Sequence, residues 1–152
     1  MIQYTLEILI DLPRDKVCEL FVDPNNLYFW QPGLLSIEPL DGGTNQPGEK
    51  TRLRYLHGKR EVEMIETLKV FSPPKEFTAT FEAKGMWMEV ENHFEETGPN
   101  QTKWISNNKA QTSGFMMKLI GLLMPGCFKK QSFLYMKYFK AFAEDRADVR
   151  EK

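Results

Sequence analysis

The chain has 152 residues, of which 41% are hydrophobic and 27% charged, and its formal net charge is −1. This length suits one domain, and the balanced charge gives no general field that would attract nucleic acid or an acidic membrane. The two cysteines, Cys18 and Cys127, have neither the spacing of a disulfide framework nor that of a zinc site. We expect a reduced, cytoplasmic protein with no signal peptide and no integral membrane contact, since the longest apolar stretch is too short to span a bilayer.

The first predicted element is a half-buried antiparallel strand over residues 2–10, in which apolar and polar side chains alternate. Pro13 then opens a short helix, for which Asp11 is the expected cap. A second short helical turn runs from Leu27 to Trp30 and ends at the Gln-Pro-Gly sequence that follows. Two small helices are therefore expected between the first strand and the second.

An antiparallel meander is expected in the middle of the chain. Stretches of alternating apolar and polar residues are separated there by turns rich in glycine and proline, at intervals of ~10–14 residues. The predicted strands contain residues 35–37, 51–57, 62–64, 77–83, 86–95 and 104–110. With the first strand they make a seven-stranded sheet, which its natural twist would curve.

Near the C-terminus the spacing of the apolar residues changes to that of a helix. A short helical stripe over residues 116–123 comes first, and Pro125 interrupts it because proline cannot donate a backbone hydrogen bond. One face of the long helix that follows consists of Phe128, Ser132, Tyr135, Phe139 and Phe142. We expect a single domain over residues 1–147 and a frayed tail over residues 148–152.

The apolar face of the sheet and the apolar face of the long helix can bury each other. This arrangement predicts an α+β fold of the helix-grip type, in which a seven-stranded curved antiparallel sheet wraps around a long C-terminal helix. Because a curved sheet does not lie flat on a helix, a gap readily remains between the two. That gap is the candidate site.

Several local sequences recur in this order in one known superfamily. They are Pro13-Arg14-Asp15-Lys16-Val17, Leu20-Phe21, Asp23-Pro24, Leu27, Trp30, the strand from Gly48 to His57, the Pro73-Pro74 turn before Phe77, and the tail from Gly114 through Pro125 to Phe142. Over about residues 2–146 the chain resembles the START-like, helix-grip superfamily, also called SRPBCC, which includes polyketide cyclase/dehydratase-like and lipid-transfer proteins. The resemblance implies a cavity between sheet and C-terminal helix that holds an apolar or amphipathic small molecule.

Strand parity and helix period together predict which residues line this cavity. The apolar candidates are Leu53, Val62, Met64, Phe81, Met86, Met88 and Trp104 from the strands, and Leu119, Leu123, Phe128, Tyr135 and Phe139 from the tail. The polar candidates on the same face are Tyr55, His57, Asn92, Ser106 and Asn108. A buried polar group without a partner costs ~1–3 kcal/mol, so these residues would suit a polar end of the cavity. The alternative is that they lie at strand ends and meet solvent.

The two histidines invite catalytic interpretations that the pattern does not favour. His93 lies between Glu91 and Glu95 on the strand face assigned to solvent, where residues two apart are separated by about 7 Å. His57 has no activating carboxylate predicted on its face. We therefore expect no metal, no cofactor and no catalytic residue that the sequence alone can identify.

Three functions remain open at this level, and the oligomeric state is not fixed by the sequence. The leading hypothesis is binding or transport of an apolar or amphipathic small molecule, with residues 114–126 as the gate. A polyketide cyclase/dehydratase-like enzyme would instead need an inward tyrosine or histidine with a second polar group in hydrogen-bond reach. A co-chaperone-like interaction module would have a filled core and an exposed apolar patch, near residues 27–34 or 116–124.

Overall fold

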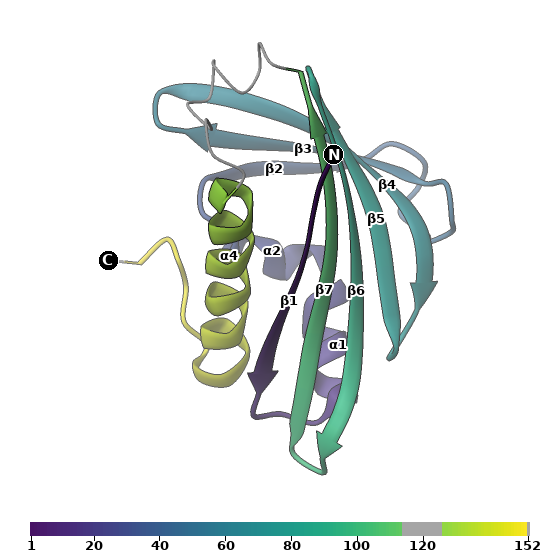
Figure 1. Ribbon diagram of the computed structural model, residues 1–152, viewed down its shortest axis with the longest axis vertical. Coiled ribbons are helices and arrows are strands. Elements are labelled where there is room, and N and C mark those ends of the chain that lie inside the picture. The colour runs from purple at the N-terminus through teal and green to yellow at the C-terminus, as the bar shows by residue number, and fades with distance from the viewer. Residues whose placement is uncertain (114–125, 152) are drawn as a thin grey trace.

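The protein is described from a computed structural model, which covers residues 1–113 and 126–151. Seven antiparallel strands form one sheet in the order β1-β7-β6-β5-β4-β3-β2. Their bounds are β1 Ile2–Ile10, β2 Leu34–Pro39, β3 Lys50–His57, β4 Arg60–Ser72, β5 Glu76–Ala83, β6 Met86–Gly98 and β7 Gln101–Thr112. The sheet turns so strongly that β2 and β3 run across the direction of β1, β6 and β7 (Figure 1).

The helices lie together on one side of this sheet (Figure 1). They are α1 (Arg14–Val22), the 3-10 turn η1 (Pro24–Asn26), α2 (Leu27–Trp30) and the long C-terminal helix α4 (Gly126–Asp145). The predicted α+β helix-grip fold is thereby confirmed, including the short helices between the first two strands. Among the described residues, no helix is both long and apolar enough to cross a membrane.

The expected cap of α1 was wrong. The residue before the first helical turn is Pro13, and no side chain caps the helix there. Asp11 lies too early for that role, and its contacts go elsewhere: its carboxylate accepts a hydrogen bond from Gln101 and its backbone N–H donates to Glu144. Asp11 thus connects the end of β1 to β7 and α4.

One end of the concave face is filled by an aromatic cluster, which we call the packed end. Phe21 of α1 lies at its centre, and its ring centroid is 5.2 to 5.7 Å from those of five neighbours. These neighbours are Trp30, Phe77, Phe94, Trp104 and Phe139, so α2, β5, β6, β7 and α4 all contribute. Phe139 is completely buried. Ring pairs of this kind stabilise a core beyond the area that they bury.

The N-terminal half of α4 is held against β1 by hydrogen bonds. The hydroxyl of Tyr4 lies 2.7 Å from the Ser132 hydroxyl and donates to the Phe128 carbonyl at 3.2 Å.

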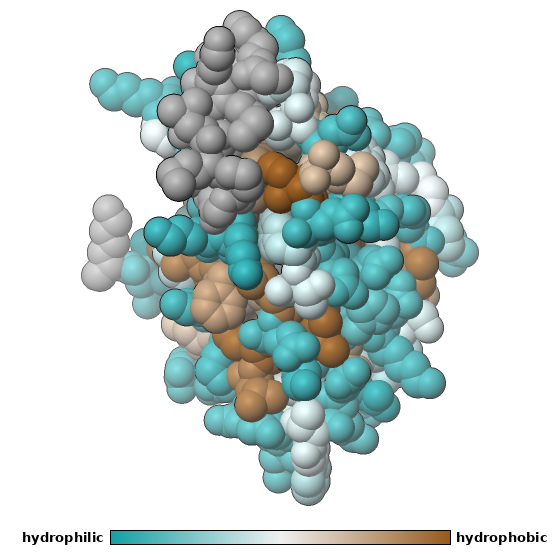
Figure 2. Space-filling view, viewed as in Figure 1, coloured by the Kyte–Doolittle hydropathy of each residue, from teal (hydrophilic) through white to brown (hydrophobic). Residues whose placement is uncertain are grey.

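In Figure 2 polar side chains cover most of the visible face, and apolar ones gather over α4 and β1 in its lower half. The exposed apolar residues include Leu9 of β1 and Leu134 of α4.

The segment after α4, which we expected to be frayed, returns to α2. The backbone N–H of Val149 donates to the carbonyl of Phe29 at 2.9 Å. The guanidinium of Arg150 lies over the Phe29 ring, 5.0 Å from its centroid, and also pairs with Asp148. These contacts give residues 148–150 defined partners in the domain.

Candidate functional site

The other end of the concave face is less tightly filled, and we call it the open end. Most of its inner-face side chains keep partial solvent exposure, although Leu53, opposite Met64, is buried. At the packed end Phe94, Trp104 and Phe139 are buried and Phe21 is partly exposed. The open end consists of Tyr55 on β3, Val62, Met64 and Glu66 on β4, Phe81 on β5, and Met86 and Met88 on β6. All but Glu66 are candidates predicted from strand parity.

Strand register brings these residues side by side. Tyr55 is opposite Val62 across β3 and β4. Phe81 is opposite both Glu66 on β4 and Met88 on β6, which makes a continuous row over three strands. Because directly opposed residues project on the same face, one surface of apolar side chains surrounds a single carboxyl group.

Glu66 is the site residue that sequence reasoning missed. The alternation of apolar and polar residues assigned Val62 and Met64 to the inner face, but the predicted strand ended there, whereas β4 continues to Ser72. The same parity carried two residues onward would have placed Glu66 on this face. Burial raises the pKa of its carboxyl to about 7, while part of the side-chain surface remains accessible.

Two phenols accompany this carboxyl. The hydroxyl of Tyr55 donates a hydrogen bond of 2.6 Å to Oε1 of Gln31, which follows α2. Burial raises the pKa of Tyr55 above its ordinary value, and the charges of Tyr135 and Glu66 raise it further. Burial also raises the pKa of Tyr135 on α4, an effect that its hydrogen bond to Gln131 opposes. Residues from β3, β4 and α4 are thus electrostatically coupled across the concave face.

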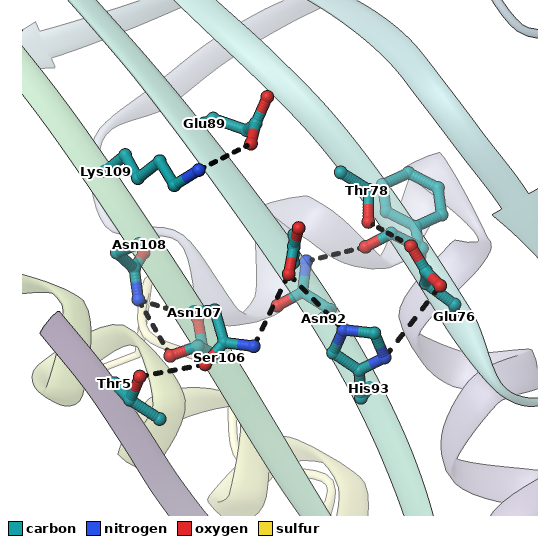
Figure 3. Close-up of polar contacts among 12 residues, drawn as sticks. Thr5, Glu76, Thr78, Glu89, Asn92, His93, Ser106, Asn107, Asn108 and Lys109 are labelled. Atoms are coloured by element: carbon teal, nitrogen blue, oxygen red, sulfur yellow. Dashed lines mark hydrogen bonds and ion pairs between the residues drawn. The ribbon is translucent and has the colours of Figure 1, made fainter. Parts of the chain in front are cut away.

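The other polar candidates are satisfied by the protein itself (Figure 3). Asn92 accepts a hydrogen bond from the Trp104 indole at 2.9 Å and donates to the Phe77 carbonyl at 3.2 Å. The amide of Asn108 donates to the carbonyl and the hydroxyl oxygens of Ser106, each at 3.0 Å. These three polar residues are buried. Their hydrogen bonds explain how they are tolerated without contact with solvent.

The remaining predicted residues fall into three groups. Leu53, Trp104, Phe128 and Phe139 are buried, and Trp104 and Phe139 belong to the packed end. His57 is exposed at the end of β3, where the chain turns into β4. Leu119 and Leu123, and with them the expected gate over residues 114–126 up to the start of α4, lie outside the described residues.

His93 lies on the outer face of the sheet, as predicted. Its Nδ1 is 3.9 Å from a carboxylate oxygen of Glu76, its register partner on β5, and its Nε2 is 3.6 Å from Glu91 (Figure 3). In residues 1–113 and 126–151, no group of three acidic, histidine or cysteine side chains is arranged to hold a metal ion.

Two hollows lie outside the concave face. One of about 340 Å³ is bordered by α1 and by the Pro73-Pro74 turn, with Cys18 in its lining. Burial raises the pKa of the Cys18 thiol to about 11, so the thiol stays protonated and is a poor nucleophile. The other, of about 130 Å³, lies at polar side chains of β1, β6 and β7 such as Gln3 and Lys109. The first hollow has apolar walls at Val22, Pro73 and Pro74 beside the carboxylates of Asp15 and Glu19, and the second is lined by polar and charged side chains for the most part.

Known structures identify the architecture. Ara h 8.0201 is 14% identical over 93% of this chain and 96% of that chain, with a TM-score of 0.72. CV1439 from Chromobacterium violaceum is 13% identical over 95% and 99% of the two chains, also with a TM-score of 0.72. The chain has the START-like helix-grip fold.

Other comparisons qualify this likeness. DynU16, a protein of the dynemicin biosynthetic locus, is 14% identical over 97% of this chain, with a TM-score of 0.68, and this chain spans about half of DynU16, 49%. No family model matches the sequence, and no curated protein matches it. At such low identities the likeness concerns the fold, and function has to be argued from the site.

Proposed function

We propose that the protein binds an apolar or amphipathic small molecule between the open end of its sheet and α4. One observation carries this proposal: strand register gathers Tyr55, Met64, Glu66 and Phe81 on the concave face, where all four keep partial solvent exposure. Burial raises the pKa values of Glu66 and Tyr55, so this face offers a partly desolvated apolar surface with polar groups on it. The START-like resemblance implies a ligand cavity in the same place.

The side chains of the open end suit an apolar guest. Phe81, Met64, Met86 and Met88 offer a continuous surface, and methionine adapts to irregular shapes because its side chain is unbranched and flexible. Each square ångström of apolar surface that a guest removes from water contributes roughly 25 cal/mol to binding. The carboxyl and the phenols provide polar anchors that can orient a head group.

A second candidate, a cyclase/dehydratase-like enzyme, is favoured by the hydrogen bond between Tyr55 and Gln31. It gives an inward tyrosine with a second polar group in reach, and the nearby Glu66 carboxyl has a pKa near neutrality, which suits a general acid or base. The origin of DynU16 in a biosynthetic locus agrees with this reading.

The interaction-module hypothesis receives less support. Within residues 27–34, Trp30 and Leu34 are buried, Leu27 and Phe29 are partly buried, and only Gly33 is exposed. The second expected patch, over residues 116–124, lies outside the described residues. The proposal further treats residues 1–147 as one cytoplasmic domain that needs no cofactor and binds no nucleic acid.

Filling the open end tests the binding proposal. We expect Met64→Trp to weaken binding of the neutral dye Nile red at least about tenfold, because the larger ring occupies the space of the guest. Its melting temperature should stay within about 5 °C of the wild type, since Met64 is partly exposed and the larger ring does not have to enter a close-packed core. Glu61→Trp, an exposed position on the same strand, is the matched control and should bind the dye normally. Failure of the wild type to bind Nile red, or severe destabilisation by Met64→Trp, would indicate a solid core.

The enzymatic candidate is tested by proton exchange. A protein that uses Glu66 as a base should accelerate deuterium incorporation next to the carbonyl of tetralone, an apolar ketone, and mass spectrometry measures the uptake. Glu66→Gln should abolish the acceleration, whereas Glu61→Gln should not. Equal exchange by the wild type and Glu66→Gln would remove the basis for this second candidate.

A further inference from the structure

Glu66 differs from other acidic residues of the sheet because its carboxyl faces inward. Its register partners are Thr51 on β3 and Phe81 on β5, and Met64 and Leu68 flank it on the same face of β4. Throughout the part of the chain that is described, no side chain donates a hydrogen bond to this carboxyl and none forms an ion pair with it. An inward carboxyl without a partner among the described residues is available to a guest.

The basic side chains near these strands are engaged on the outer face. Lys69 forms an ion pair with Glu89 at 2.5 Å, and Lys109 reaches the same carboxylate at 4.0 Å (Figure 3 shows the latter). Arg52 of β3 pairs with Glu38 at 2.9 Å. The inner-face neighbours of Glu66 on β3 and β5 are uncharged, so the protein supplies no countercharge from these strands.

The energetics of an unpaired carboxylate discriminate between classes of guest. An ionised carboxylate that is removed from water without a partner is strongly destabilised, which is also why burial raises the pKa of Glu66. A cationic guest would supply the missing charge, a neutral guest would leave the carboxyl protonated, and an anionic guest would add repulsion. The rings of Phe81, Tyr55 and Tyr135 also favour a cation, which is attracted to aromatic faces.

We infer that the open end selects amphipathic amines, with the ammonium group paired to Glu66 and the apolar body lying against the methionine and phenylalanine side chains of β4, β5 and β6. This inference rests on the proposed function and adds the charge class of the guest. The charge of Glu66 acts on Tyr55, whose hydroxyl donates its proton to Gln31 and retains lone pairs for a polar group of the guest.

Three probes share one apolar ring and represent a cationic, a neutral and an anionic guest: naphthylethylamine, naphthylethanol and naphthylacetate. Calorimetric titration of the wild type near neutral pH should give an affinity for the amine at least about tenfold higher than for the alcohol, and weakest binding for the acetate. The amine affinity should fall about tenfold for each pH unit below the Glu66 pKa of about 7, because the carboxyl must then lose a proton to pair.

Two substitutions in β4 test whether the preference for the amine depends on Glu66. Glu66→Gln keeps the shape of the side chain and should bring the amine affinity down to that of the alcohol. Glu61→Gln is the same substitution at an exposed position of the strand and should leave the preference intact. Circular dichroism checks that both variants are folded.

The outcomes separate this inference from the proposed function. If Nile red binds but the amine has no advantage, or if Glu66→Gln keeps the advantage, the amine inference is overturned and the binding proposal stands. If the wild type binds neither the dye nor any of the three probes, both fail. An amine preference that depends on Glu66 and on pH supports both.

Discussion

At the scale of single residues, Glu66 makes the stability of the protein depend on pH. Its pKa is about 7 in the folded protein and 4.5 as an ordinary glutamate, so the folded state holds its proton over a range in which the unfolded state releases it. The stability contributed by the protonated carboxyl is therefore complete below about pH 4.5 and is lost as the pH rises through about 7. At about 1.4 kcal/mol per unit, the loss is at most about 3 kcal/mol.

Glu66→Gln should remove this loss, because glutamine does not ionise. The free energy of unfolding of the variant, relative to the wild type, should increase by up to about 3 kcal/mol between about pH 4.5 and about pH 7.5 and then level off. Urea denaturation at a series of pH values measures the difference, with Glu61→Gln as the exposed control. Parallel curves for the wild type and Glu66→Gln would show that the carboxyl is solvated in the folded protein.

Strand parity predicted most inner-face residues but not their partners. It placed Asn92, Ser106 and Asn108 on the inner face, where they are buried, but it could not show that Trp104 and backbone carbonyls satisfy them. Those hydrogen bonds join residues from different strands or depend on local backbone geometry, and sequence spacing does not reveal them. Parity also could not tell that His57 lies at a strand end, because it gives no strand length.

At the scale of elements, the junction of β2 with β3 depends on a glycine. Gly33 has φ +80°, and its carbonyl accepts a hydrogen bond of 2.7 Å from the Leu56 N–H. A Cβ atom at this position would lie 2.4 Å from the Leu56 carbonyl oxygen. Backbone atoms cannot yield to such a contact as a flexible side chain can, so Gly33→Ala would force the strands apart.

Gly58, in the β3–β4 turn, provides a matched control for this junction. It also has a positive φ, +66°, but a Cβ atom there would meet nothing within 4 Å. Gly58→Ala should cost about 1–2 kcal/mol for the strained backbone alone, and Gly33→Ala at least about 2 kcal/mol more. Equal losses in chemical denaturation would contradict the close approach of β2 and β3.

Element types were more predictable from sequence than element ends. Alternation and the change to helical period identified all seven strands and the long helix, because each buries one face. The length of β4 was missed: the prediction covered 62–64, whereas the strand extends from Arg60 to Ser72 with a bulge after Leu68. The bulge disturbs the alternation only beyond Leu68, and before it Ile65 is an apolar residue at an outer-face position, which obscures the alternation although the strand continues.

At the scale of the whole molecule, the START-like fold divides its concave face into two ends with different packing. Phe139 is completely buried at the packed end, among the rings of Phe21, Trp30 and Trp104. Phe81, a residue of the same type, keeps partial exposure at the open end. The packed end accounts for stability, and the open end is available for a guest.

Truncating these two phenylalanines should therefore have unequal effects. Phe139→Ala should cost about 3–5 kcal/mol of unfolding free energy, because it leaves a cavity in a close-packed cluster. Phe81→Ala should cost less than about 2 kcal/mol, since its ring is partly exposed in the folded protein, but it should weaken Nile red binding. Equal destabilisation by the two substitutions would mean that the sheet is packed uniformly against α4.

The methionine methyl groups report most directly on whether a guest enters the open end. In NMR spectra of protein labelled at these methyls, Nile red should shift the signals of Met64, Met86 and Met88 with one-to-one saturation, because its aromatic rings would lie against them. The signals of Met136, buried at the packed end, and of exposed Met1 should stay in place. Shifts confined to Met1, or no shifts at all, would contradict the account of an apolar site between sheet and helix.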